Sequence, residues 1–124
     1  MLVPPSCIPV RVPCEWSLDG NYGDQTPLMA SHGISNRQVV ITIQKDFTNI
    51  ERLLAKLLKA PKSLRRPLDR LNSALWELMD GTRTFDEIVE IMQECYNEDI
   101  VPANERCSSS VSQLVELNLV TVNN

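Results

Sequence analysis

The residue types that most often carry out chemistry are few in this chain and are scattered along it. The cysteines Cys7, Cys14, Cys95 and Cys107 form no CxxC pair, and the only histidine, His32, lies in a polar stretch. A structural zinc site usually shows two close pairs of ligands. We therefore expect reduced thiols, no metal site and no cofactor. The alternative, in which Cys7 and Cys14 form a redox pair or half of an intermolecular metal site, stays open.

A group of acidic residues is the strongest candidate for acid–base chemistry or metal binding. Its members are Asp86, Glu87, Glu90 and Glu94. The i, i+4 spacing of Glu90 and Glu94 is typical of the solvated face of a helix. The serine run at 108–110 has no histidine near it to act as a base, and the isolated glycines form no phosphate-binding loop. We therefore expect no catalytic residues and a protein that is not an enzyme.

The charge of the chain is distributed unevenly. The net charge is −4, but residues 45–70 carry a local charge of +5, so that the rest of the chain carries −9. Such asymmetry bears on partners rather than on fold. No stretch approaches the roughly 20 apolar residues of a membrane-spanning helix, and the start of the chain lacks the pattern of a secretory signal. We expect a cytoplasmic protein that does not interact with membranes.

The length of 124 residues and the apolar share of 43% suit one domain with a modest core. We expect residues 1–37 to form an irregular N-terminal segment, with a short edge strand over 11–16. The stretch 18–38 is rich in Gly, Asn, Ser and Asp and is typical of a long mobile loop. The β-branched run 39–43 is the clearest strand. The folded domain is therefore placed at 38–124.

Helices dominate the rest of the chain. Apolar residues at helical spacing predict a first helix over 48–58 with a basic outer face. We interpret it as a core-facing helix, the alternative being an amphipathic helix that binds a membrane surface or a partner. A second helix follows Asp69 and closes at Gly81, since glycine readily adopts the left-handed conformation of a helix C-terminus.

Two further helices and a strand complete the pattern. Thr84 and Glu87 form a capping box before a helix over 85–96, which is expected to bury Cys95. A fourth helix begins near Pro102, ends at a left-handed Asn118 and leads into a strand-like segment. This order of helices with a closing strand is typical of a winged helix-turn-helix. We predict an α+β fold, in which a helical bundle has a small antiparallel sheet at one edge.

Winged helices often bind DNA, so the charge of the expected recognition helices matters. The helix over 85–96 carries four acidic residues and no basic one, and DNA phosphates would repel it. A DNA-binding regulator is therefore the second hypothesis rather than the first. A protein–protein scaffold domain is the third.

One segment carries a resemblance to a known family. Residues 68–88 read LDRLNSALWELMDGTRTFDEI, with a Leu-Asp start, a Leu-Trp-Glu-Leu centre, Asp-Gly-x-x-Thr and then a Glu-Ile pair. This pattern resembles the PqqD-like family, named after coenzyme PQQ synthesis protein D. The resemblance is specific over 66–122 and looser before that.

The resemblance implies a function. PqqD-like domains are recognition elements for ribosomally made, enzymatically modified peptides (RiPPs). They bind the leader of the precursor peptide and present it to a modifying enzyme, often a radical SAM enzyme, without catalysing a reaction. In that family the peptide adds as a strand to the edge of a three-stranded sheet, against the last helix.

Transferred to this chain, the third strand of the sheet lies around residues 64–68. The peptide-binding residues that the resemblance implies are Leu64, Arg65, Arg66, Leu68, Arg106, Ser110 and Gln113. The basic stretch 62–66 at the same edge predicts an acidic leader peptide.

Overall fold

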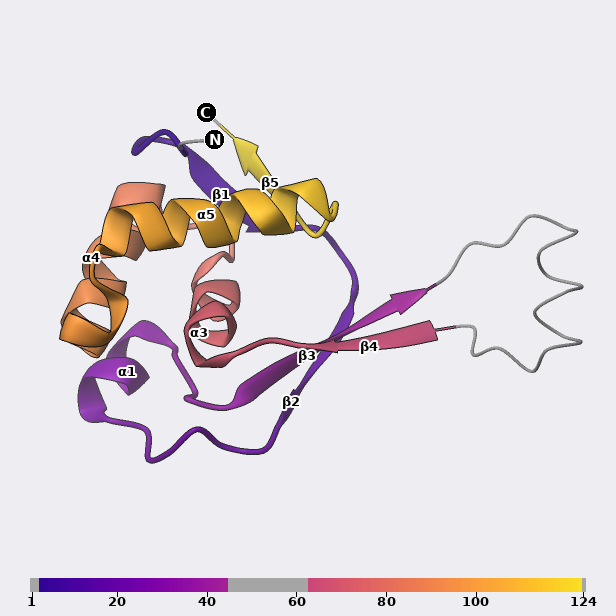
Figure 1. Cartoon of the computed structure of the whole chain (residues 1–124), viewed down its shortest axis with the longest axis horizontal. Helices are drawn as coiled ribbons and strands as arrows, with labels where there is room; N and C mark the ends of the chain where they lie inside the picture. Colours follow the sequence, from indigo (N-terminus) through magenta and orange to yellow (C-terminus); the bar gives the residue numbers. More distant parts are fainter. Residues whose placement is uncertain (1–2, 45–62, 124) are drawn as a thin grey trace, which may run out of the picture.

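The computed structural model describes residues 3–44 and 63–123. In chain order its elements are β1 (Ile8–Arg11), β2 (Glu15–Asp19), α1 (Pro27–His32), β3 (Gln38–Gln44), β4 (Ser63–Pro67), α3 (Arg70–Leu78), α4 (Phe85–Tyr96), the 3₁₀ turn η1 (Asn97–Ile100), α5 (Ala103–Glu116) and β5 (Val120–Asn123). The helices pack on one side of a three-stranded antiparallel sheet (Figure 1). The predicted α+β class is confirmed. The helix expected over 48–58 lies outside the described residues.

The three-stranded sheet has the order β2-β3-β4, with both pairs antiparallel. β3 is the central strand, and its residues Val39 and Ile41 are fully buried. Ile41 pairs with Trp16 on β2 and with Arg66 on β4. Because side chains alternate along a strand, these three residues face the same side of the sheet, toward the core. The strands predicted over 39–43 and around 64–68 are both found.

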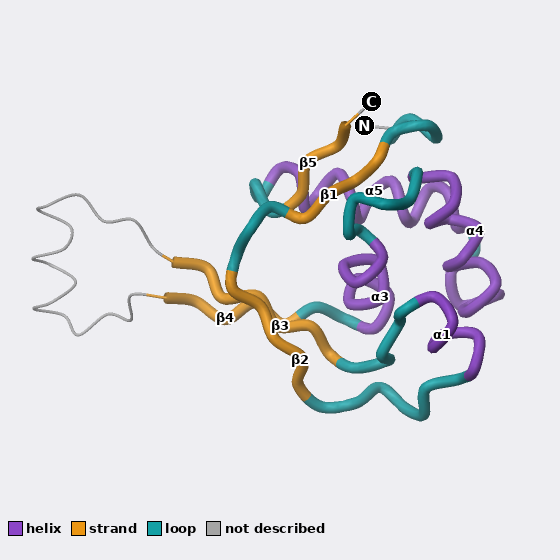
Figure 2. Tube along the Cα trace, turned by 180° about the vertical axis from the view of Figure 1, so that it is seen from behind, coloured by secondary structure: helices purple, strands orange, loops and turns teal. Residues whose placement is uncertain are grey.

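The N-terminal segment takes part in the fold instead of being irregular. β1 pairs antiparallel with β5, so that Val10 lies opposite Thr121, and Figure 2 shows this ribbon from behind. The single strand expected over 11–16 is wrong, because Pro13 falls between two strands and separates them. The domain boundary at residue 38 stays a prediction. In the structure, strands from both sides of it pair in both sheets.

The long loop expected over 18–38 is also wrong. β2 continues to Asp19, and the six-residue helix α1 begins at Pro27. The Thr26 side chain accepts a hydrogen bond from the Met29 N–H, and Gly33 ends the helix with φ at 82°. Such a short helix has no room for a repeating apolar stripe, so its caps are the only sequence signal.

The helices over the second half of the chain begin and end close to the predicted positions. α4 spans the predicted residues 85–96, and its capping box is formed as expected. Hydrogen bonds from the Thr84 backbone and hydroxyl lower the pKa of the Glu87 carboxyl. Asn118 adopts a φ of 60°, as predicted for the end of the last helix. Cys95 is only partly buried, because it lies at the border of the apolar face of α4.

The described order of α3, α4, α5 and β5 agrees with the predicted order of helices and closing strand. The finer description as a winged helix stays a prediction. No helix within residues 3–44 and 63–123 is long and apolar enough to cross a membrane.

Arg11 connects the N-terminal strands β1 and β2 to the helix α3. Its Nη1 donates hydrogen bonds to the Trp76 carbonyl at 2.9 Å and to the Glu77 carbonyl at 3.4 Å. Its guanidinium also lies over the Trp16 ring, 5.1 Å from the ring centroid. The last carbonyls of a helix have no partner within it and carry partial negative charge, so a cation is favoured there.

We predict that Arg11→Ala lowers the free energy of unfolding by about 1–3 kcal/mol, since charged hydrogen bonds to part-buried carbonyls are lost. The measurement is urea unfolding followed by tryptophan fluorescence. Arg37→Ala is the matched control, because Arg37 also donates to two backbone carbonyls, of Leu18 and Gly20, but at an exposed site. Equal losses for the two variants would contradict the role given to Arg11.

Candidate functional site

Two adjoining hollows lie between the start of α3 and the side of α5. The larger measures about 380 Å³ and the smaller about 70 Å³. Asp69 and Asn72 line both, so the hollows are adjacent. We call them together the β4–α5 groove. The larger hollow is lined by Arg66, Pro67, Leu68, Asp69, Asn72, Gln113 and Leu114, and the smaller by Asp69, Leu71, Asn72, Leu75, Ile100, Arg106, Cys107 and Ser110.

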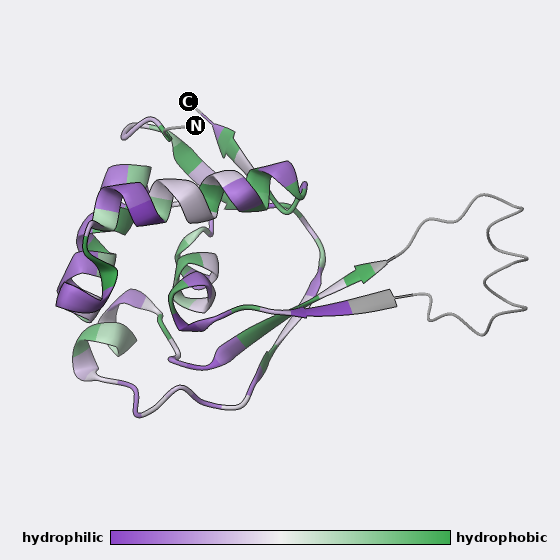
Figure 3. Ribbon diagram, in the orientation of Figure 1, coloured by the Kyte–Doolittle hydropathy of each residue, from purple (hydrophilic) through white to green (hydrophobic). Residues whose placement is uncertain are grey.

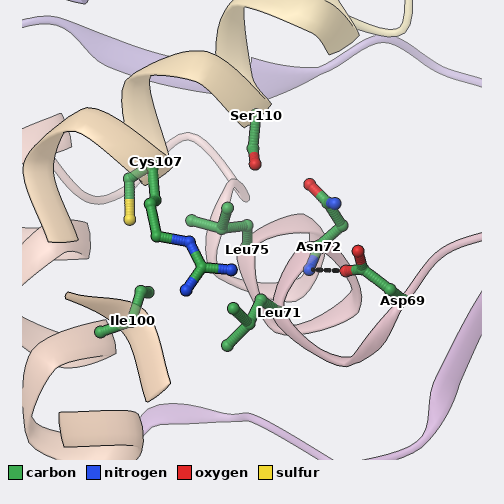
Figure 4. Close-up of a pocket in the computed structure, with 8 residues that line it drawn as sticks. Asp69, Leu71, Asn72, Leu75, Ile100, Cys107 and Ser110 are labelled. Carbon is green, nitrogen blue, oxygen red and sulfur yellow. Dashed lines mark hydrogen bonds between the residues drawn. The ribbon is translucent and has the colours of Figure 1, made fainter. Parts of the chain in front are cut away.

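Five of the seven residues that the family resemblance implied line this groove. Arg66, Leu68 and Gln113 line the larger hollow. Arg106 and Ser110 line the smaller one, and Figure 4 shows Ser110 on α5 directed toward α3. The structure thus brings these side chains together from β4 and α5. Their role in binding a peptide stays a prediction.

The other two residues lie elsewhere or contribute differently. Arg65 does not line the groove, because neighbouring residues of a strand face opposite sides of the sheet. Its side chain is 68% exposed and pairs with Asp19 on β2 at 3.4 Å. Leu64 contributes its backbone to β4, opposite Ile43. The Arg65 side chain therefore lies outside the groove, and a role of Leu64 and Arg65 in binding a peptide stays a prediction.

The outer edge of β4 is open in the described part of the chain, where β3 is the only strand that pairs with it. The Leu68 N–H donates to the Val39 carbonyl at 2.8 Å. Hydrogen-bonded pairs alternate along an antiparallel ladder, so the Arg66 backbone faces β3 and the Arg65 backbone faces outward. Pro67 belongs to the outward set as well and has no N–H, which a sheet tolerates at an edge. Ser63 has the same orientation, so three carbonyls and the N–H groups of Ser63 and Arg65 face outward along β4.

The groove has a mainly polar surface that lies over buried apolar side chains. Leucines from α3 and Ile100 form much of the smaller hollow (Figure 4). Asp69 caps α3 by accepting a hydrogen bond from the Asn72 N–H at 2.8 Å. Arg106 donates to the Asp99 carbonyl at 2.6 Å, which holds its guanidinium near the smaller hollow. Figure 3 shows the contrast between mostly hydrophobic β3 and the hydrophilic residues in the coloured part of β4.

Groups able to carry out chemistry are not assembled in this groove. Cys107 is fully buried, and burial raises the pKa of its thiol to about 11, with a smaller opposing effect of Arg106. Within the described residues, no three His, Cys, Asp or Glu side chains lie close enough to hold a metal ion. The arrangement is suited to binding an extended ligand.

The comparisons with known proteins bear on the same part of the chain. The model of the family described as coenzyme PQQ synthesis protein D (PqqD) matches residues 67–120. Residues 67–120 are PqqD-like. The matched stretch runs from the last residue of β4 to the first residue of β5, and so includes both walls of the groove. No curated protein and no solved structure matches the chain.

Several residues that line the groove were not predicted from the sequence. Asp69 and Asn72 lie at the N-terminus of α3, directly after the predicted strand. The order of the elements could therefore have predicted that they lie next to the groove. Ile100 comes from the 3₁₀ turn after α4. A 3₁₀ turn of four residues is too short for a periodic sequence pattern from which it could be predicted.

We predict that iodoacetamide at pH 8 labels Cys95 well before Cys107. The thiolate is the reactive form, and a thiol with a pKa of about 11 is only about 0.1% thiolate at pH 8. Cys107 is also fully buried, whereas Cys95 is partly exposed. Mass spectrometry of the digested protein gives both labelling rates. In guanidinium chloride the two rates should converge, and fast labelling of Cys107 in the folded protein would contradict its burial.

Proposed function

We propose that this chain is a non-catalytic peptide-binding domain. It recognises the leader of a ribosomally made precursor peptide and presents it to a separate modifying enzyme, such as a radical SAM enzyme. The observation that carries the proposal is the open edge of β4 next to the β4–α5 groove. Since ribosomal peptides are made in the cytoplasm, we expect the domain to act there.

Strand addition uses both features of this site. A peptide laid along β4 exchanges main-chain hydrogen bonds with the outward N–H and carbonyl groups of the strand, which provides affinity for many sequences. Every second side chain of the peptide then faces the groove, where Arg66, Asn72 and Gln113 line the larger hollow. Selectivity comes from these side-chain contacts.

The described surface favours this function over DNA binding. All four acidic residues of α4 are exposed, so that a duplex approaching this helix meets four negative charges and no positive one. Affinity for DNA depends on cations that contact phosphates. A scaffold domain without peptide affinity is the remaining alternative, and the experiment below distinguishes it.

The precursor is identified by capture from native-cell extract on the immobilised full chain, with mass spectrometry of peptides below roughly 10 kDa. The leader of that precursor is then synthesised, and its Kd is measured by fluorescence anisotropy. Binding by strand addition depends little on salt, whereas DNA affinity falls steeply with the logarithm of salt concentration.

We predict that Arg65→Pro weakens binding of the synthetic leader by roughly tenfold or more. The change removes one outward N–H of β4, that of residue 65, and leaves one peptide carbonyl without a donor. Proline is compatible with an edge strand, and the edge strand β4 already contains Pro67. Arg65→Ala is the matched control, because it loses the same side chain but keeps the N–H. Equal Kd values for the two variants would refute strand addition to β4, and capture of DNA or of large proteins alone would refute the peptide-binding function.

A further inference from the structure

Two neighbouring arginines on β4 have different surroundings. Arg65 faces away from the groove and pairs with Asp19. Arg66 faces the core side of the sheet, is partly buried and lines the larger hollow. A charge at these two adjacent positions therefore acts on opposite faces of the same strand.

Arg66 differs from the other described arginines in having no side-chain partner among the described residues. The others donate to a carboxylate or a backbone carbonyl: Arg65 to Asp19, Arg70 to Asp99, Arg83 to Asp80, Arg106 to Asp99, and Arg11 and Arg37 to carbonyls. A partly buried guanidinium that lacks an anion has given up some hydration without the compensation of an ion pair. An anion that enters the larger hollow would supply that compensation.

Among the described residues that line this hollow, the one acidic residue already accepts another hydrogen bond. Asp69 lines the same hollow, but its Oδ1 caps α3 by accepting from the Asn72 N–H. No ion pair joins Asp69 to Arg66, both of which lie in the described part of the chain. Arg106, the other cation of the groove, is held by the Asp99 carbonyl. Among the described residues, the guanidinium of Arg66 therefore has no anionic partner.

We propose that Arg66 makes this site select peptides with a carboxylate side chain, Asp or Glu, at the position over the larger hollow. This inference rests on the peptide-binding function proposed above. A guanidinium binds a carboxylate through two parallel hydrogen bonds, which fixes the geometry as well as the charge. Arg65, on the opposite face, does not contribute to this selection.

The test uses a displayed library of random twelve-residue peptides, selected on the full-length wild-type protein and on charge-reversed variants. Wild-type protein should enrich peptides with Asp or Glu at one fixed position. Arg66→Glu should lose that preference and favour Lys or Arg at the same position. Arg65→Glu, the matched control with the same change of charge one residue away, should keep the acidic preference.

Measured affinities complete the test. For a selected acidic peptide, Arg66→Glu should raise Kd by roughly tenfold and Arg66→Gln by several-fold, while Arg65→Glu should change Kd by no more than about twofold. The neutral glutamine variant preserves the test if charge reversal disturbs folding. An acidic preference that survives both Arg66 substitutions overturns the proposal.

The outcomes also separate this proposal from the function on which it rests. If wild-type protein enriches no peptide, or if its peptides bind Arg65→Pro as well as Arg65→Ala, strand addition itself fails. If peptides are enriched and require the Arg65 N–H but show no acidic position that depends on Arg66, only the role of Arg66 fails.

Discussion

The contact of Trp76 with Trp16 and Arg11 joins the three main parts of the structure. Trp76 is fully buried on α3, and the Trp16 ring from β2 meets it edge to face at 6.1 Å between centroids. Arg11 at the end of β1 covers Trp16 and binds the Trp76 carbonyl. One cluster thus connects the three-stranded sheet, the two-stranded sheet and the helix on which α5 packs. The distance between β4 and α5, and hence the width of the groove, depends on it.

The position of β3 determines where the chain can accept another strand. β3 is paired on both sides, whereas β4 is paired only with β3 among the described strands. Unpaired edges are a liability for a soluble protein, and proline and charged residues commonly protect them. β4 carries two arginines and ends in a proline, so it resists indiscriminate pairing while keeping the outward N–H groups of Ser63 and Arg65. An edge of this kind favours a ligand whose side chains also suit the groove.

Sequence periodicity predicted the elements whose stabilising contacts are mostly local. α3, α4 and α5 each have a buried stripe and recognisable ends, and the β-branched run of β3 is unambiguous. The N-terminal strands were misread because their partners are remote: β1 pairs with β5, which no local pattern reveals. Five of the residues that the family resemblance implied line the groove, whereas the Arg65 side chain faces away from it. Which face an edge-strand residue occupies depends on register, and a shift of one residue exchanges the faces.

The pairing of β1 with β5 has a consequence for the order of folding. Val10 and Thr121 are separated by almost the whole chain, and closing so long a loop costs conformational entropy before any contact compensates for it. During synthesis β1 leaves the ribosome early and has no partner strand until β5 follows. The helices and the three-stranded sheet are therefore expected to assemble first, and the β1–β5 ribbon, which is joined to Met79 and Leu119 by backbone hydrogen bonds, to form late.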